Sequence, residues 1–254
     1  MGKIIKIALG ILVFIVVIVG VFLYQITRYD ESSLSSRYNF GVHLTTDSKL
    51  ENPTFYVPIP VLRNEIMMVN MAIDDNNQKS DGWNLSIIET SNGKMLKINA
   101  KEFAPVVNKM VELKPPVPGQ TGDIPTGNSF SFVRGDKSVD VSLVANHMID
   151  TMNATENEPI LSQKFNLTLS SYPYPSNGIP PKTQKYDSII YADYKSSSNA
   201  TVEVFVLIDG RNEWFAGGWA SNTYHESLGT TFTGEKHGWF PVNGELVEGE
   251  GLYN

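Results

Sequence analysis

An uncharged apolar run near the N-terminus, from Ile7 to Tyr24, constrains this chain more than any other feature of its sequence. Its 18 residues are at the lower end of the length that a helix needs to cross the hydrocarbon core of a bilayer. Isoleucines on both sides extend the run. The sequence therefore predicts a transmembrane anchor at residues 1–28, with residues 4–26 in contact with the membrane.

Charged residues on either side of the run predict its orientation. Lys3 and Lys6 precede it, whereas Arg28 is followed closely by Asp30 and Glu31. Because positive residues stay on the cytoplasmic side, we expect a single-pass protein of the cell membrane with a cytoplasmic N-terminus and an extracellular C-terminal domain. A cleaved signal peptide or a processed pilin-type helix is the alternative, but signal peptides have apolar segments of about 7–15 residues that end beside a small-residue cleavage site.

The composition after the anchor limits the partners of the chain. Residues 29–254 contain 17 Lys and Arg against 27 Asp and Glu, a net charge of −10. Such an acidic domain repels nucleic acid and anionic lipid. The chain has no cysteine, so packing rather than disulfides must hold the fold, and the length suffices for that.

Alternating apolar and polar residues dominate the chain beyond a short polar stalk at 29–37. The segment 38–45, YNFGVHLT, is typical, with its apolar residues on one face. Ten or more such segments with turn residues between them predict an all-β domain at 38–254, an antiparallel β-sandwich. A Pro/Gly-rich stretch at 114–128 is a candidate subdomain boundary.

Three local predictions accompany this fold. Asn92 and Gly93 form a strong signal for a tight hairpin turn. Asp209 and Gly210 are expected to form another turn, which would end the preceding strand. Only residues 100–113 have a pattern that favours a short helix, and a proline within them limits its length.

The stretch 212–227, NEWFAGGWASNTYHES, concentrates aromatic and polar side chains around a glycine pair, and two interpretations of it stay open. In the first, its rings fill the core. Three of the four tryptophans follow a glycine, and a strand glycine leaves a gap that a neighbouring ring can cover. In the second, its rings and polar groups bind a glycan or an envelope protein. The candidate binding residues are Glu213, Trp214, Trp219, Asn222, Tyr224, His225 and Trp239.

Burial separates these two interpretations, because adjacent strand residues point to opposite faces. We expect Trp219 and Trp239 to be buried in the core. Trp214 or Tyr224 is expected at the surface, where a ring can stack on a ligand.

Metal-site and catalytic patterns are weak throughout the chain. His225 and His237 lie near two glutamates, but their spacing matches no zinc motif. The acidic loop that starts at Asp74 resembles a calcium loop in composition, yet Lys79 and Leu85 replace its glycine and its final glutamate. We therefore expect no catalytic residue, no metal and no cofactor, with an irregular calcium site as the one open alternative. Four sequons for N-linked glycosylation occur, at Asn84, Asn153, Asn166 and Asn199, and the expected extracellular location makes this modification possible.

Four segments together resemble uncharacterised, N-terminally anchored envelope proteins of archaea. They are TFYVPIPV at 54–61, NGKMLKI at 92–98, NEWFAGGWASNTY at 212–224 and GEKHGWFPVNGEL at 234–246. The resemblance implies an outward location and carries no known activity.

Taken together, the sequence predicts a membrane-anchored extracytoplasmic protein of the cell envelope with a binding or structural role. The alternatives are an anchored hydrolase that acts on envelope polymers and an accessory subunit of a membrane complex.

Overall fold

The structure is a computed structural model that describes residues 2–27, 33–63, 65–66, 68–69, 82–111, 129–170 and 180–253. Only the backbone is described for residues 3–9, 25–27, 106–111 and 129–134. The elements are α1 (Gly2–Thr27), β1 (Ser35–Thr46), β2 (Leu50–Pro58), β3 (Pro60–Leu62), β4 (Glu65–Ile66), β5 (Trp83–Thr90), β6 (Gly93–Ala100), β7 (Glu102–Phe103), β8 (Val106–Val111), β9 (Ser129–Val144), α3 (Ala154–Asn157), β10 (Ile160–Leu161), β11 (Phe165–Ser170), β12 (Lys182–Lys195), β13 (Thr201–Phe215), β14 (Trp219–Thr233) and β15 (Lys236–Gly251).

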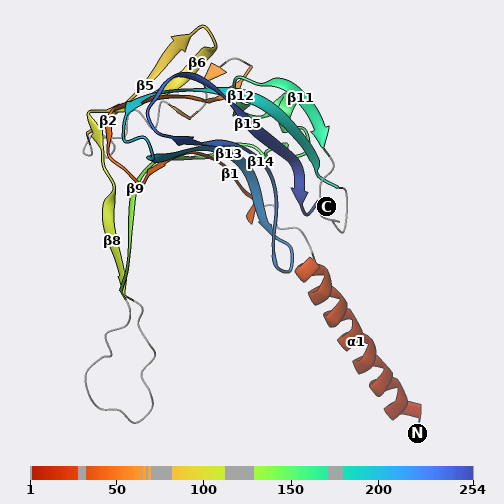
Figure 1. Ribbon diagram of the computed structural model, residues 1–254. Coiled ribbons are helices and arrows are strands. Elements are labelled where there is room, and N and C mark those ends of the chain that lie inside the picture. Colours follow the sequence, from red (N-terminus) through yellow and green to blue (C-terminus); the bar gives the residue numbers. More distant parts are fainter. Residues whose placement is uncertain are drawn as a thin grey trace, which may run out of the picture.

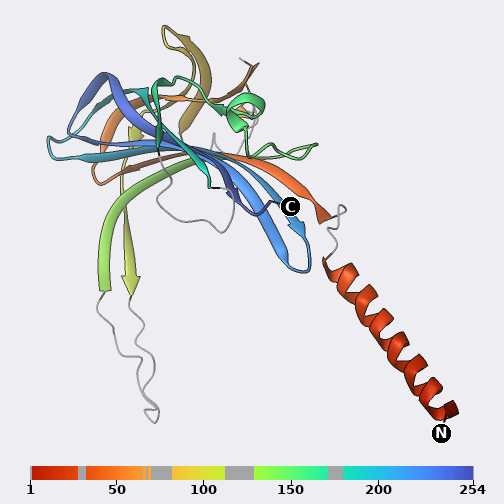
Figure 2. The same ribbon diagram turned by 90° about the vertical axis from the view of Figure 1, so that its right-hand side faces the viewer.

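Twelve of the described strands form one antiparallel sheet. Ten of them follow the order β5-β6-β2-β12-β15-β14-β13-β1-β9-β8, while β11 pairs with β12 and β7 with β2. The prediction of an antiparallel all-β domain is confirmed. The strands are not divided between two large sheets, however, because the second sheet contains only β10, β3 and β4. Strands of up to 16 residues twist strongly, and the large sheet therefore curls (Figures 1 and 2).

The core lies between one face of this sheet and a segment that crosses it. We call residues 145–164, which include α3 and β10, the strap, and the face that they cover the strap face; the opposite face is the open face. On β13 every second side chain, such as Val204 and Ile208, is buried on the strap face. These side chains belong to one apolar cluster with Ile149 and Leu161 of the strap. Removing such side chains from water contributes about 1.5–3 kcal/mol each.

The predicted turn at Asn92 and Gly93 joins β5 and β6, with Gly93 at a φ of 93° that favours glycine. The predicted turn at Asp209 and Gly210 is wrong. Both residues lie inside β13, which pairs without interruption with β14 from Thr201 to Phe215.

The short helix expected within 100–113 is also wrong, because the described residues of this stretch, 100–111, contain the end of β6, then β7 and β8. Pro105 separates the two strands, and Phe103 is buried in the core. A proline in that position removes a helical hydrogen bond, whereas extended backbone tolerates it between strands. The candidate boundary at 114–128 lies outside the described residues.

Rings do cover strand glycines, but not the glycines that precede tryptophans. Tyr224 lies over Gly210 and Tyr186 over Gly244, so closely that an added Cβ would overlap each ring. The glycines before tryptophans have no neighbouring atom within 4 Å of an added Cβ, and these are Gly82, Gly218 and Gly238. The expectation that a ring covers the glycines before tryptophans is therefore wrong, and rings cover other strand glycines instead.

Helix α1 extends away from the sheet in both views (Figures 1 and 2). Within the described part of the chain, no helix combines the length and the apolar character that crossing a membrane requires.

The contact between Tyr186 and Gly244 predicts an asymmetric response to alanine. Gly244→Ala should destabilise the protein by about 1–3 kcal/mol, because the added Cβ would overlap the buried ring of Tyr186. Gly218→Ala, at an open turn, should change the free energy of unfolding by less than about 0.5 kcal/mol. Thermal unfolding of the two purified variants measures the difference, and equal stabilities would contradict the packing described here.

Candidate functional site

The seven candidate binding residues do not form one surface. Trp214, Asn222 and Tyr224 are buried on the strap face. Glu213 and His225 lie on the open face, because neighbouring residues of a strand alternate between faces. The patch predicted from the sequence is therefore divided by the sheet itself.

The predicted distribution of buried and exposed rings is wrong at three positions. Trp214 is only 2% exposed and Tyr224 is fully buried, whereas Trp219 is 76% exposed. Trp219 follows the turn of the β13–β14 hairpin and has the strand parity of His225, which puts its side chain on the open face. Trp239 is half-buried, on β15.

The buried polar members of the patch hold the strap in place. Asn212 makes two hydrogen bonds to the backbone of Ile149 in the strap. Its Oδ1 accepts a hydrogen bond from the N–H of Ile149 at 2.9 Å, and its Nδ2 donates one to the carbonyl oxygen of Ile149 at 2.8 Å. Asn222 accepts hydrogen bonds from Thr151 Oγ1 at 3.1 Å and from Asn212 Nδ2 at 2.8 Å. Buried polar groups need such partners, so Asn222 is a structural residue rather than a ligand-binding one.

Two further strap-face side chains repeat this arrangement along the strap. Glu248 accepts hydrogen bonds from Thr155 N–H at 2.7 Å and Thr155 Oγ1 at 2.9 Å. The hydroxyl of Tyr224 donates to the carbonyl oxygen of Pro159 at 2.7 Å. The ring of Tyr224 thus packs over Gly210 and its hydroxyl binds the strap, so neither is exposed to a ligand.

The far end of the strap carries a buried ion pair that the sequence analysis missed. Lys164 Nζ lies 2.8 Å from Oε1 of the fully buried Glu226, an ion pair without hydrogen-bond geometry. Oε2 of Glu226 accepts the N–H of Leu161 at 2.8 Å. Burial and the neighbouring Glu226 raise the pKa of Tyr186, whose ring centroid lies 5.3 Å from Lys164 Nζ. Glu226 is two residues from Tyr224 on β14, so both side chains point to the same face of the sheet. A glutamate at a position of the buried parity indicates a buried charge that needs a partner, and this pattern could have predicted the pair.

The ion pair predicts a strong coupling between its two partners. Glu226→Leu should destabilise the protein by about 3–5 kcal/mol, because it leaves Lys164 buried without its counter-charge. Adding Lys164→Met should recover most of this loss, since both charges are then absent. Unfolding by denaturant measures all variants, and a double variant no more stable than Glu226→Leu alone would contradict the coupling.

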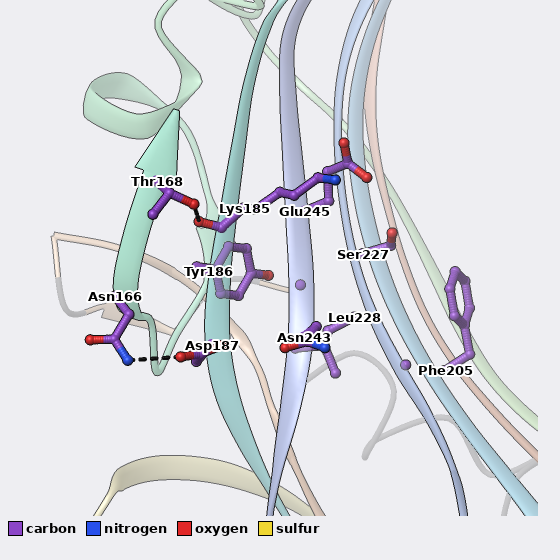
Figure 3. Close-up of a pocket in the computed structure, with 12 residues that line it drawn as sticks. Asn166, Thr168, Lys185, Tyr186, Asp187, Phe205, Ser227, Leu228, Asn243 and Glu245 are labelled. Carbon is purple, nitrogen blue, oxygen red and sulfur yellow. Dashed lines mark hydrogen bonds between the residues drawn. The ribbon is translucent and has the colours of Figure 1, made fainter. Parts of the chain in front are cut away.

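The open face contains a groove of about 600 Å³ that crosses β11, β12, β15, β14 and β13 (Figure 3). Polar side chains line it from β12 and β15, among them Lys185, Asp187 and Glu245. Gly229 and Gly244 also line the groove, to which they contribute backbone only, and the ring of Phe205 lies beside Gly229.

One wall of the groove is β11, which the sequence analysis did not connect with the site. Asn166 Nδ2 donates to Asp187 Oδ2 at 2.7 Å, and Thr168 Oγ1 donates to the carbonyl oxygen of Lys185 at 3.3 Å (Figure 3). The hydrogen bond from Asn166 therefore holds one carboxylate oxygen of Asp187 in place at the edge of the groove.

Farther along the same face of β12 and β15 is a group of half-buried rings, which we call the ring cluster: Tyr56, Tyr191 and Trp239. Tyr56 and Tyr191 are stacked, with centroids 4.5 Å apart and planes 16° from parallel. Trp239 meets Tyr191 edge-on at 5.3 Å. Beside the cluster, His237 Nδ1 lies 3.1 Å from Asp193 Oδ1.

Of the candidate residues, only Trp239 belongs to this arrangement. Its partners come from β2 and β12, which are distant in sequence and are brought together by the pairs Tyr191–Tyr56 and Tyr191–Trp239. His225 instead pairs with Glu250, with Nδ1 and Oε2 3.3 Å apart. No local motif indicates these contacts, because they depend on strand order and register.

The remaining sequence predictions concern modification and metals. All four sequon asparagines are exposed, and Asn166 lines the groove. Among the residues that the structure describes, no group of three or more His, Asp or Glu is placed to hold a metal ion. The loop that starts at Asp74 lies outside them.

Comparison of the chain with protein-family models, curated proteins and solved structures gave no match. The function is therefore inferred from the open face itself.

Proposed function

We propose that this protein is a membrane-anchored, extracytoplasmic binding protein whose open face holds an extended, uncharged polar polymer, a glycan of the cell envelope. The observation that carries the proposal is the alignment of the ring cluster and the groove on the same face of β12 and β15.

The length of this surface suits a polymer. Trp239 in the ring cluster and Glu245 in the groove are six residues apart on β15. At about 3.3 Å per residue they are separated by about 20 Å along the strand. A small molecule would occupy one end only, whereas an oligomer reaches both.

The chemistry of the two ends suits a sugar chain. Partly exposed rings offer apolar faces for stacking, as Trp239 and Tyr191 do. Convergent polar groups that fix orientation are typical of ligand sites, and Asp187 and Glu245 supply them in the groove. The net charge of −10 beyond residue 28 opposes an acidic polymer and favours an uncharged one.

The anchor is proposed from the sequence of the whole apolar run. The run lies within α1, but residues 7–9 belong to the part for which only the backbone is described. The large apolar side chains from Ile11 to Tyr24 are about half exposed or more, and lipid would remove this surface from water. Lys3 and Lys6 then place the N-terminus in the cytoplasm.

The proposal predicts that Trp239 is needed for glycan binding. The purified full-length protein should bind short uncharged oligosaccharides in calorimetric titration. Trp239→Ala should weaken the affinity at least about tenfold, a loss of about 1.4 kcal/mol, because a stacking ring is removed. Trp219→Ala is the matched control, since Trp219 is exposed on a different part of the molecule.

Three results would contradict this function. The first is the absence of binding to any uncharged oligosaccharide. The second is an equal effect of both substitutions, with near-ultraviolet circular dichroism confirming that each variant is folded. The third is tighter binding of acidic than of uncharged oligosaccharides.

A further inference from the structure

Exposed apolar side chains gather at the end of the sheet where β1 begins. Each belongs to the end of a strand or to the segment just after one, and each is between 43% and 76% exposed. We call them the rim: Val144, Met148, Phe215, Trp219 and Leu252. Apolar patches of this kind mark surfaces that contact a protein or a membrane.

Strand register brings the rim residues to one end of the molecule. The pairs that establish this are Ser35 with Glu213, Arg37 with Val144, and Phe215 with Trp219. The N–H of Leu252 donates to the carbonyl oxygen of Ser221 at 2.9 Å, which adds the end of β15.

The rim is also the part of the β-domain that lies next to α1. The N–H of Phe215 donates to Ser33 Oγ at 2.8 Å, which ties the stalk to the hairpin. Ser33 is six residues beyond Thr27, the end of α1, a distance of at most about 20 Å. In both views the tip of the β13–β14 hairpin lies beside the C-terminal end of α1 (Figures 1 and 2).

The rim has the chemistry of a membrane interface. Phe215 and Trp219 meet edge-on with centroids 5.9 Å apart, and tryptophan is enriched at the level of lipid headgroups. Beside Trp219 is a recess of about 190 Å³ lined by Arg211 and Glu213. Their side chains form an ion pair at 2.9 Å, so the recess presents both signs of charge. This arrangement complements a zwitterionic headgroup, whereas the acidic domain as a whole repels anionic lipid.

We propose that the rim rests in the interfacial layer of the membrane that holds α1, with Phe215 and Trp219 inserted among zwitterionic headgroups. This inference rests on the proposed anchor. The β-domain then has a second attachment to the bilayer and a defined orientation. Trp239 lies 13 residues from Leu252 along β15 and its extension, about 40 Å when measured along the strand, so the ring cluster lies far from the rim.

Tryptophan emission tests this contact, because α1 contains no tryptophan and all four lie in the β-domain. The full-length protein is reconstituted into phosphatidylcholine vesicles whose acyl chains carry bromine atoms near the headgroup, which quench a tryptophan on contact. We expect the wild-type emission to be partly quenched relative to unbrominated vesicles. Trp219→Phe should abolish the quenched component. The matched Trp239→Phe variant should retain it.

Alkaline extraction of the same vesicles separates failure of the rim from failure of the anchor. Protein that resists extraction but shows no quenching keeps the anchor and overturns the rim proposal. Protein released by alkali overturns the anchor, and with it the basis of the rim. Quenching that persists in Trp219→Phe, or a blue shift of the emission that depends on protein density in the vesicle, also overturns the proposal, and the latter identifies a second copy as the occupant.

Discussion

The hydrogen bonds that hold the strap to the sheet are the interaction on which the rest of the structure depends. A sheet of this size exposes a large apolar face unless something covers it, and the strap contributes few large apolar side chains of its own. Its position is instead determined by polar side chains of the sheet, above all Asn212 and Glu226, which bind its backbone. Because a buried polar group without a partner is costly, a displacement of the strap that breaks these contacts is disfavoured.

The strap also determines which face of the sheet is available. With one face closed, Trp214 and Tyr224 are core residues, and the proposed ligand contacts lie on the open face. Gly244 has the parity of the strap face and makes room there for the ring of Tyr186. Gly229 has the parity of the open face, and the ring of Phe205 lies beside it there.

Residue alternation predicted most of the strands, because it depends only on local geometry. The burial of Trp214 follows from alternation once β13 is known to be one uninterrupted strand. Counted along β13, Trp214 has the same parity as Val206 and Ile208, which are also buried. A turn at Asp209 and Gly210 would break that count, but Gly210 lies inside β13, where it admits the ring of Tyr224.

The ring cluster and the groove could not be predicted in this way. Tyr56 and Tyr191 are 135 positions apart, and only the pairing of β2 with β12 makes them neighbours. Twelve strands allow a very large number of orders, and the alternation of each strand is compatible with most of them. The face of a side chain can therefore be read from the sequence, whereas its neighbours on other strands cannot.

The position of β1 has a consequence for how the chain matures. β1 is an interior strand whose two partners, β9 and β13, begin 94 and 166 residues after it. Contacts between such distant segments form slowly, because the entropy of closing a long loop is lost before they contribute. During synthesis β1 therefore stays without its partners until β13 has been made. Its two unpaired edges are the element of the chain most prone to aggregation in that interval.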